Sequence, residues 1–254
     1  MYQRPAAPLS IGGVLDDGFR LAKASFTSFI GLSLVAAILG NLPYFFVGEI
    51  DPADPEVQMG TVGLMALLMV PIALIFFGAI IARIAAVADG QTVSTGEALG
   101  IGLRRLVPLV LWAILYVVAC VVGSLLLLVP GIILGLSLSF GAYLVIIDRA
   151  GPLESLKQSH RLVWGNWWRT AVLLTVVIFV FAAAYVLLGV VSGFGVLVDE
   201  QMAVSDTTAN VVSTLVTAVL NPVSYCFGLA ILNDLRLRKQ GEDLEQRIGE
   251  LESA

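Results

Sequence analysis

Long runs of apolar residues alternate with short polar segments along most of this 254-residue chain. A helix needs about twenty consecutive apolar residues to cross the roughly 30 Å hydrocarbon core of a bilayer. Six stretches meet or approach that length, and each predicts a membrane-spanning helix. They cover residues 26–48, 61–83, 106–129, 131–147, 168–190 and 207–232.

The spacing of these stretches predicts an all-α, polytopic membrane protein whose six spans form three hairpins. Only Pro130-Gly131 divides the third span from the fourth, so we expect a tight turn there between two antiparallel helices. The 131–147 stretch is short for a full crossing and is expected to lie tilted, pinched or partly re-entrant. Whether it spans the membrane completely stays open.

Composition supports a membrane protein and offers no catalytic chemistry. Hydrophobic residues make up 58% of the chain and charged residues 13%, about half the charged share of an average soluble domain. Cys120 and Cys226 both lie in apolar runs, and His160 is the only histidine, so we expect no disulfide framework and no metal site. Phosphate-binding loops and nucleophile motifs do not occur. We therefore expect no cofactor and no enzymatic activity.

The basic residues give the orientation. Lys and Arg accumulate on the cytoplasmic side of membrane proteins. The expected outer segments 49–60, 130–131 and 191–206 contain none, and they hold seven acids instead. We therefore expect a multi-pass membrane protein with both termini in the cytoplasm and no cleaved signal peptide. All fourteen basic residues fall on the inner side: Arg4, Arg20, Lys23, Arg83, Arg104, Arg105, Arg149, Lys157, Arg161, Arg169, Arg236, Arg238, Lys239 and Arg247.

An ordered set of residues recurs three times and suggests an internal repeat. Chance recurrence of common residues is the alternative. The repeat predicts one membrane domain, 1–235, with units at about 10–90, 94–149 and 152–235, followed by a cytoplasmic tail, 236–254. A Leu and an Arg five positions later precede the odd-numbered spans: Leu15 and Arg20, Leu99 and Arg104, Leu156 and Arg161. Each even-numbered span carries a Pro, a Phe-Gly pair and an Asp: Pro71, Phe77-Gly78 and Asp89; Pro130, Phe140-Gly141 and Asp148; Pro222, Phe227-Gly228 and Asp234.

Each unit is expected to begin with a cytoplasmic amphipathic helix lying in the headgroup layer. Residues 12–24 and 152–164 show this pattern, with apolar side chains on one face and charges on the other. Three tryptophans and an arginine follow the second of these helices. An aromatic belt with a positive-inside anchor explains them. The alternative is an anionic lipid-headgroup site made of Lys157, Arg161, Trp164, Trp167, Trp168 and Arg169.

The span interiors hold few charges, which bears on function. Arg83 lies near an inner end, and the other polar residues in the spans are uncharged. Because coupled carriers usually need a buried carboxylate or histidine, that class is disfavoured. Two hypotheses remain: a non-enzymatic protein that organises the envelope or binds partners, and a permease for a lipid-like or uncharged molecule. A membrane-deep polar pocket lined by Asn221, Ser224, Ser137, Ser139 or Tyr143 would favour the permease.

The middle of the chain resembles the YciC-like family of bacterial inner-membrane proteins and the related membrane domain fused to some glycerophosphodiester phosphodiesterases. Stretches 90–94, 129–134, 148–159 and 161–166 carry the resemblance, notably Val129-Pro130-Gly131-Ile132 and Ser159-His160-Arg161-Leu162. The resemblance implies an inner-membrane protein of about six helices, and no catalytic residues. Since the phosphodiesterase domain is absent from this chain, its activity is not inherited. We expect anionic lipids on the cytoplasmic side, protein partners or a homo-oligomer, and no nucleic acid, as binding partners.

Overall fold

The computed structural model describes residues 2–47, 55–198 and 206–253. Within these ranges the chain forms helices and no strands. They are α1 (Ile11–Val47), α2 (Pro55–Ala88), α3 (Thr95–Arg104), α4 (Leu106–Leu126), α5 (Leu128–Leu138), α6 (Gly141–Ile147), α7 (Pro152–Val163), α8 (Trp167–Val198) and α9 (Asp206–Ser253). The acidic segments predicted to lie outside, around residues 49–54 and 199–205, are not among the described residues.

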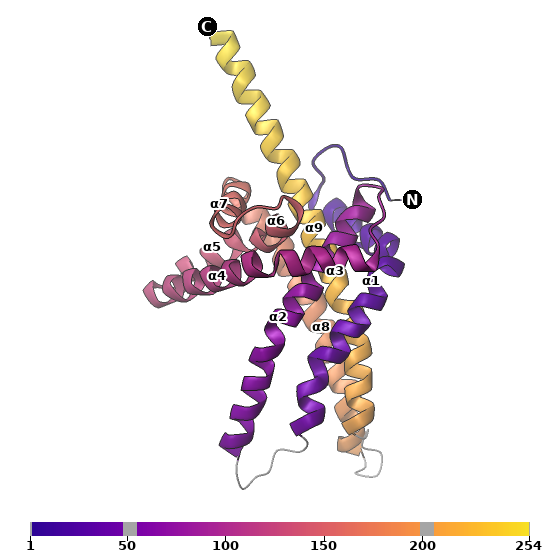
Figure 1. Cartoon of the computed structure of the whole chain (residues 1–254). Helices are drawn as coiled ribbons and strands as arrows, with labels where there is room; N and C mark the ends of the chain where they lie inside the picture. The colour runs from indigo at the N-terminus through magenta and orange to yellow at the C-terminus, as the bar shows by residue number, and fades with distance from the viewer. Residues whose placement is uncertain (1, 48–54, 199–205, 254) are drawn as a thin grey trace.

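Helices α1, α2, α8 and α9 run alongside one another as a bundle (Figure 1). Their shared core is apolar and includes Leu21, Phe29, Ile84, Leu173 and Leu232. Away from this core the helices expose Val, Leu and Ile side chains, as expected where lipid rather than water surrounds a helix. The bundle is therefore built to stand in a bilayer.

The two ends of the bundle differ in composition. The N-terminal segment, α3, α6, α7 and the last part of α9 lie at one end, which we call the basic end (Figure 1). Helices α1 and α8 end, and α2 and α9 begin, at the opposite end. Trp167, which opens α8, is thus at the basic end, as the charge pattern predicts for residues 164–169.

Six segments of the described chain are long and apolar enough to cross a membrane, which confirms an integral, multi-span membrane protein. They are Ile11–Leu42, Gly63–Ala88, Leu106–Leu126, Val129–Ile147, Trp167–Leu187 and Val211–Gly241. Each overlaps one of the stretches predicted from sequence, although the first begins fifteen residues earlier than predicted.

That earlier start corrects the prediction of a separate interfacial helix at 12–24. Residues 12–24 are the first turns of α1, which continues into the span without a break. No Gly or Pro stands between Lys23 and the apolar run, so nothing there ends the helix. The segment also contributes to the protein interior, because Val14, Asp17 and Leu21 are buried.

Helices α4 and α5 project sideways from the basic end and do not run with the bundle (Figure 1). We call them the α4–α5 arm. Only Arg105 separates α3 from α4, and its backbone angles of φ −97° and ψ 2° do not reverse the chain. Helix α4 therefore continues in the direction of α3, across the end of the bundle. Neither helix of the arm contains a charged residue.

The turn predicted at Pro130-Gly131 lies three residues earlier. Leu127 is the single extended residue between α4 and α5, with φ −166° and ψ 149°. Pro130 lies in the first turn of α5, where a helix does not need the N–H that proline lacks. Gly131 instead lets the two helices approach, since a β-carbon there would overlap Ser124. Gly123 of α4 lies opposite, and a β-carbon on it would come within 3.1 Å of the Gly131 α-carbon.

The 131–147 segment is two helices and not one, because the chain leaves the helix at Ser139 and Phe140. Such a break exposes backbone groups that lipid cannot satisfy. The buried Ser159 of α7 supplies both missing partners: its hydroxyl donates to the Ser137 carbonyl at 2.7 Å and accepts from the Phe140 N–H at 3.2 Å. Helix α7 thus fixes the α5–α6 break from outside.

A similar compensation occurs at Pro222 inside α9. Proline has no N–H, so the Ala218 carbonyl four residues earlier loses its helical partner. This carbonyl accepts a hydrogen bond of 2.6 Å from the buried Ser33 hydroxyl of α1. The free carbonyl therefore joins α1 to α9.

The three Phe-Gly pairs share a packing role. A β-carbon on Gly78 would lie 2.9 Å from Ile146, and one on Gly141 or Gly228 would overlap Trp112 or Tyr143. Each glycine thus allows a close approach by another element. The threefold repeat itself stays a prediction, because the α4–α5 arm takes a direction that α1–α2 and α8–α9 do not share.

Candidate functional site

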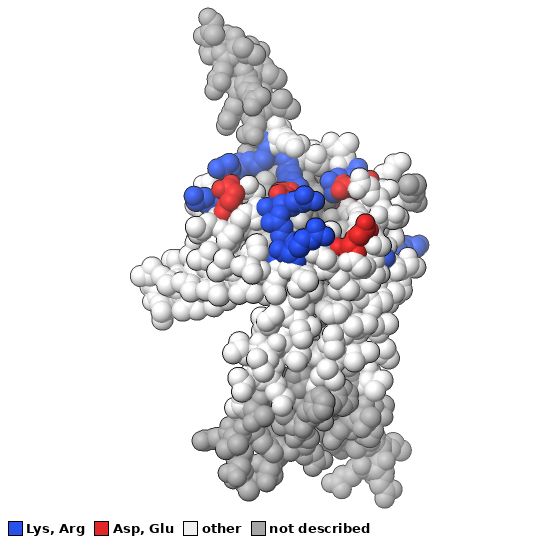
Figure 2. Space-filling view, in the orientation of Figure 1, with Lys and Arg blue, Asp and Glu red and all other residues white. Residues whose placement is uncertain are grey.

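Positively charged side chains gather at the basic end, while the α4–α5 arm and the described part of the bundle below it carry no charge on the face that Figure 2 shows. Three places, two at the basic end and one within the bundle, could act on a ligand or partner. They are the outer surface of α7, a pocket between α2, α3 and α6, and a cavity between α1, α2 and α9.

The outer surface of α7 brings together three of the six residues predicted for a headgroup site. Lys157, Arg161 and Trp164 are exposed, as is Leu153 one turn before Lys157. Their spacing of four, four and three residues places them on one helix face. We call these four residues the α7 stripe. Helix α7 packs through the opposite face, where Ser155, Ser159 and Val163 are buried.

The other three predicted residues differ from the α7 stripe in their exposure and contacts. Trp168 is 78% exposed and packs edge-on against the half-buried Trp167, with ring centroids 4.8 Å apart. The Arg169 side chain is only 18% exposed and forms an ion pair with Asp234 at 3.0 Å. Arg169 therefore links α8 to α9, a role that the sequence pattern did not indicate.

Asp234 is the centre of this network. Its buried carboxylate accepts hydrogen bonds from Arg169 and Arg238, each at 3.0 Å, and from the Leu9 N–H at 2.8 Å. The Leu9 carbonyl in turn accepts from both arginines. We call this group the Asp234 clamp. It fixes the N-terminal segment against α8 and α9.

The other two repeated aspartates also pair with arginines from distant segments. Asp89 binds Arg4 at 3.0 Å, and Asp148 binds Arg236 at 2.6 Å. All three repeated acids are therefore used in ion pairs at the basic end. Tyr2 adds a further link, since its hydroxyl donates to Asp17 at 2.9 Å. Burial and this hydrogen bond raise the Tyr2 pKa above its ordinary value.

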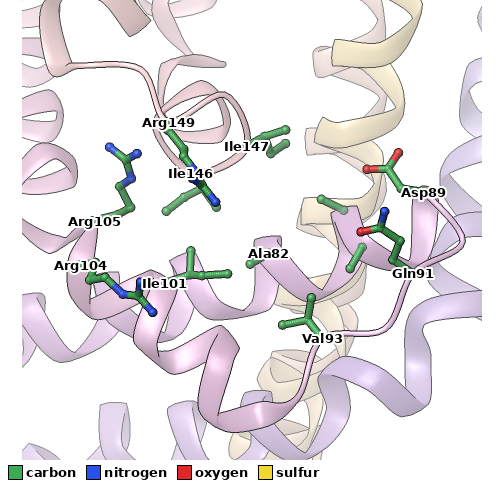
Figure 3. Close-up of a pocket in the computed structure, with 12 residues that line it drawn as sticks. Ala82, Asp89, Gln91, Val93, Ile101, Arg104, Arg105, Ile146, Ile147 and Arg149 are labelled. Carbon is green, nitrogen blue, oxygen red and sulfur yellow. The ribbon is translucent and has the colours of Figure 1, made fainter.

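The pocket at the basic end has a volume of about 390 Å³ and is open to the surface. Arg104, Arg105 and Arg149 lie on one side of it, and Asp89 and Gln91 lie on the other (Figure 3). We call it the arginine pocket. Its remaining lining is apolar: Ala82, Ala85, Ala86, Val93, Ile101, Ile146 and Ile147.

Arg149 has an unusual backbone. Its φ of 55° lies in the left-handed region, where a residue with a β-carbon costs about 1 kcal/mol or more. Helices often end on a glycine in this conformation. An arginine stands here instead, immediately after α6.

Helix α3, which leads to Arg104 and Arg105, begins with a capping box. The Ser94 hydroxyl accepts from the Glu97 N–H, and the Glu97 carboxylate accepts from Ser94. These hydrogen bonds, from the Ser94 backbone first and its hydroxyl second, lower the pKa of Glu97. The cap fixes where α3 starts and hence where the two arginines fall.

The third place is a cavity of about 330 Å³ between α1, α2 and α9, within the bundle. Its polar lining residues are Ser33, Asn41, Thr217, Asn221 and Tyr225. Of the residues expected to line such a pocket only Asn221 does so; Ser137, Ser139, Tyr143 and Ser224 do not line it. Ser33 and Asn41 donate to carbonyls of Ala218 and Ala37, so these polar groups already have partners.

Sequence reasoning did not find the arginine pocket. The sequence placed Arg104, Arg105 and Arg149 among the basic residues of the inner side and indicated no further role for them. Their position around one pocket depends on α3 and α6 both packing against α2 at the basic end, which no periodicity in the sequence indicates.

Comparison with known proteins places this membrane architecture in a family. A family model described as "Uncharacterised protein family (UPF0259)" matches residues 55–227, from the start of α2 to the Phe-Gly pair of α9. The chain belongs to this family. The matched part includes the α7 stripe and all three arginines of the arginine pocket.

Two UPF0259 membrane proteins are similar to this chain. That of Pectobacterium carotovorum is 29% identical over 155 residues, which are 61% of this chain and 59% of the relative. That of Photorhabdus laumondii is 32% identical over 89 residues, 35% of each chain. The chain thus spans about three fifths of the first relative's length and a third of the second's. No solved structure matches the chain.

Proposed function

We propose that this UPF0259 protein is a non-enzymatic inner-membrane protein that gathers anionic lipid at the cytoplasmic surface and thereby organises the membrane around it. The observation that carries the proposal is the α7 stripe, in which two cations stand between two exposed apolar side chains. This combination suits the headgroup layer, where Leu and Trp enter the acyl boundary and cations meet lipid phosphates.

The position of α7 supports this role. The apolar α4–α5 arm packs against α7 and lies on its bundle side (Figure 1). An arm without charge prefers the hydrocarbon, and α7 above it then lies at the level of the headgroups. Within the described residues no ion pair joins Lys157 or Arg161 to a carboxylate. Both cations are thus available to lipid.

The proposal includes the orientation and the repeat. The basic end faces the cytoplasm, because moving Lys and Arg through the bilayer is far costlier than leaving them behind. The shared roles of the three aspartates and the three Phe-Gly glycines support three related units. In this proposal Trp167 and Trp168 anchor the protein at the membrane surface, and Arg169 belongs to the Asp234 clamp.

Permeation is a second candidate, favoured by the cavity that Asn221 lines. It requires that the cavity open to an uncharged or lipid-like substrate. Replacing Asn221 with Leu would then abolish transport of that substrate across the membrane of proteoliposomes and leave lipid binding unchanged. Equal transport by the variant would remove the candidate.

Native mass spectrometry of the detergent-purified protein tests the lipid proposal. A Lys or Arg near an anionic surface contributes about 1 kcal/mol, so Lys157→Gln/Arg161→Gln should weaken binding of anionic phosphatidylglycerol about thirtyfold. Binding of zwitterionic phosphatidylcholine should not change. The control Lys157→Arg/Arg161→Lys keeps both charges and should bind as the unaltered protein does. Equal phosphatidylglycerol binding by all three proteins would refute the proposal.

A further inference from the structure

The arginine pocket is separate from the α7 stripe and shares no residue with it. Two of its arginines come from consecutive positions, Arg104 at the end of α3 and Arg105 directly after it. The third, Arg149, follows α6. The fold therefore places three arginines, from segments more than forty residues apart in sequence, on one side of the same pocket (Figure 3).

The charge of these arginines is not compensated within the described part of the chain. Asp89, the carboxylate that lines the pocket, already pairs with Arg4. Asp148, next to Arg149 in sequence, already pairs with Arg236. Arg104 donates to the Gly100 carbonyl at 3.2 Å, a neutral acceptor on its own helix. Because the pocket has three cations in its lining and its nearest carboxylates are already paired, it attracts an anion.

The shape of the lining indicates what kind of anion. Behind the arginines the walls are small or branched apolar side chains, including Ala82, Ile101 and Ile146. The pocket lies at the basic end, and the described part of the bundle beneath that end shows no charge on the face in Figure 2. Its volume of about 390 Å³ is in the range of small-ligand sites, roughly 300–1,000 Å³.

We propose that the arginine pocket binds the phosphate of an amphiphilic phosphate ester, with the guanidinium groups of Arg104, Arg105 and Arg149 around the phosphate oxygens and the apolar walls against the ester's carbon chain. Planar guanidinium groups bind phosphate oxygens through paired, charge-assisted hydrogen bonds. A lipid headgroup and a water-soluble phosphate ester share this chemistry. A site of this kind gives the protein selectivity for one class of lipid or metabolite, beyond the general attraction of the α7 stripe.

Arg149 offers a variant that removes the ligand contact without endangering the fold. Because its backbone is left-handed, glycine is better suited to this position than arginine is. Arg149→Gly should therefore fold at least as stably as the unaltered protein. Loss of binding in this variant cannot then be attributed to unfolding, and a melting curve verifies the point.

The experiment measures binding to the full-length protein in detergent by isothermal titration, with two groups of probes. Short-chain phosphatidic acid and phosphatidylglycerol represent lipids, and glycerol 3-phosphate and inorganic phosphate represent soluble sources. Arg149→Gly and Arg104→Gln/Arg105→Gln should each weaken binding of the preferred probe about tenfold or more, the effect of losing a charge-assisted contact. The control Lys23→Gln removes an exposed cation that does not line the pocket and should have no effect.

The outcomes separate the sources and the two proposals. Tight binding of the lipid probes alone identifies a headgroup site, and equal binding of glycerol 3-phosphate identifies a soluble ester; either supports the pocket. Equal binding of every probe by the pocket variants and the unaltered protein overturns it. Because Lys157→Gln/Arg161→Gln leaves the pocket intact, failure of the α7 stripe proposal does not produce that result.

Discussion

Replacing Asp234 with Asn tests whether the Asp234 clamp stabilises the basic end. The substitution keeps the size of the side chain and one oxygen that can accept from the Leu9 N–H. It removes the negative charge that faces Arg169 and Arg238. Both arginines would then be left next to a neutral amide, with their remaining contact at the Leu9 carbonyl.

The size of the effect follows from burial. Removing one partner of a buried ion pair costs about 3–5 kcal/mol, whereas an exposed pair contributes at most about 1 kcal/mol. The Asp234 side chain is 2% exposed, but Arg169 is 18% and Arg238 26% exposed, so water partly compensates the arginines. We therefore expect Asp234→Asn to cost about 3 kcal/mol and to lower the melting temperature by several degrees.

Thermal unfolding of the detergent-purified protein measures this cost, and limited proteolysis reports release of the N-terminal segment. Asp16→Asn is the matched control, because Asp16 pairs with Arg20 at an exposed position and should shift melting little. Arg169→Gln, alone and together with Asp234→Asn, completes a double-mutant cycle that should show strong coupling. An unchanged melting temperature for Asp234→Asn, or additive effects in the cycle, would contradict the clamp.

Three further substitutions test the packing. Ser159→Ala removes both hydrogen bonds at the α5–α6 break and should destabilise the protein by about 1–3 kcal/mol in thermal unfolding, while the neighbouring Gln158→Ala should not. Ser33→Ala should cost a similar amount by leaving the Ala218 carbonyl unsatisfied, and an unchanged melting temperature would show that the kink has another partner. Gly102→Ala would overlap the Ile75 carbonyl and should separate α3 from α2, whereas Gly96→Ala on the same helix has open space and should melt at the same or a higher temperature.

The spans could be predicted from sequence because their signal is local. A run of about twenty apolar residues is itself the signature of a membrane span, and the charge between the runs predicts the orientation. The Phe-Gly glycines and the repeated aspartates could also be singled out, although their roles in packing and ion pairing could not. Those roles depend on which distant segment lies opposite each residue.

The direction of α4 and the meeting of distant segments around one site could not be predicted from the sequence. Whether Arg105 turns the chain depends on two backbone angles, and the answer decides whether α4 crosses the membrane with the bundle or leaves it sideways. From sequence, Arg169 was interpreted as a positive-inside anchor or, alternatively, as part of a headgroup site. Its ion pair with Asp234, 65 residues later in the chain, could not be predicted. The arginine pocket, likewise, exists only once α3 and α6 both pack against α2.

The sorting of charge by the membrane underlies the whole account, and labelling of single cysteines tests it most directly. In a background without Cys120 and Cys226, cysteines placed at positions 53, 203 and 158 would be treated with a membrane-impermeant maleimide in spheroplasts. The account predicts labelling at 53 and 203 in intact spheroplasts, and at 158 only after the membrane is permeabilised. Labelling of 158 together with 53 or 203 in intact spheroplasts would contradict it.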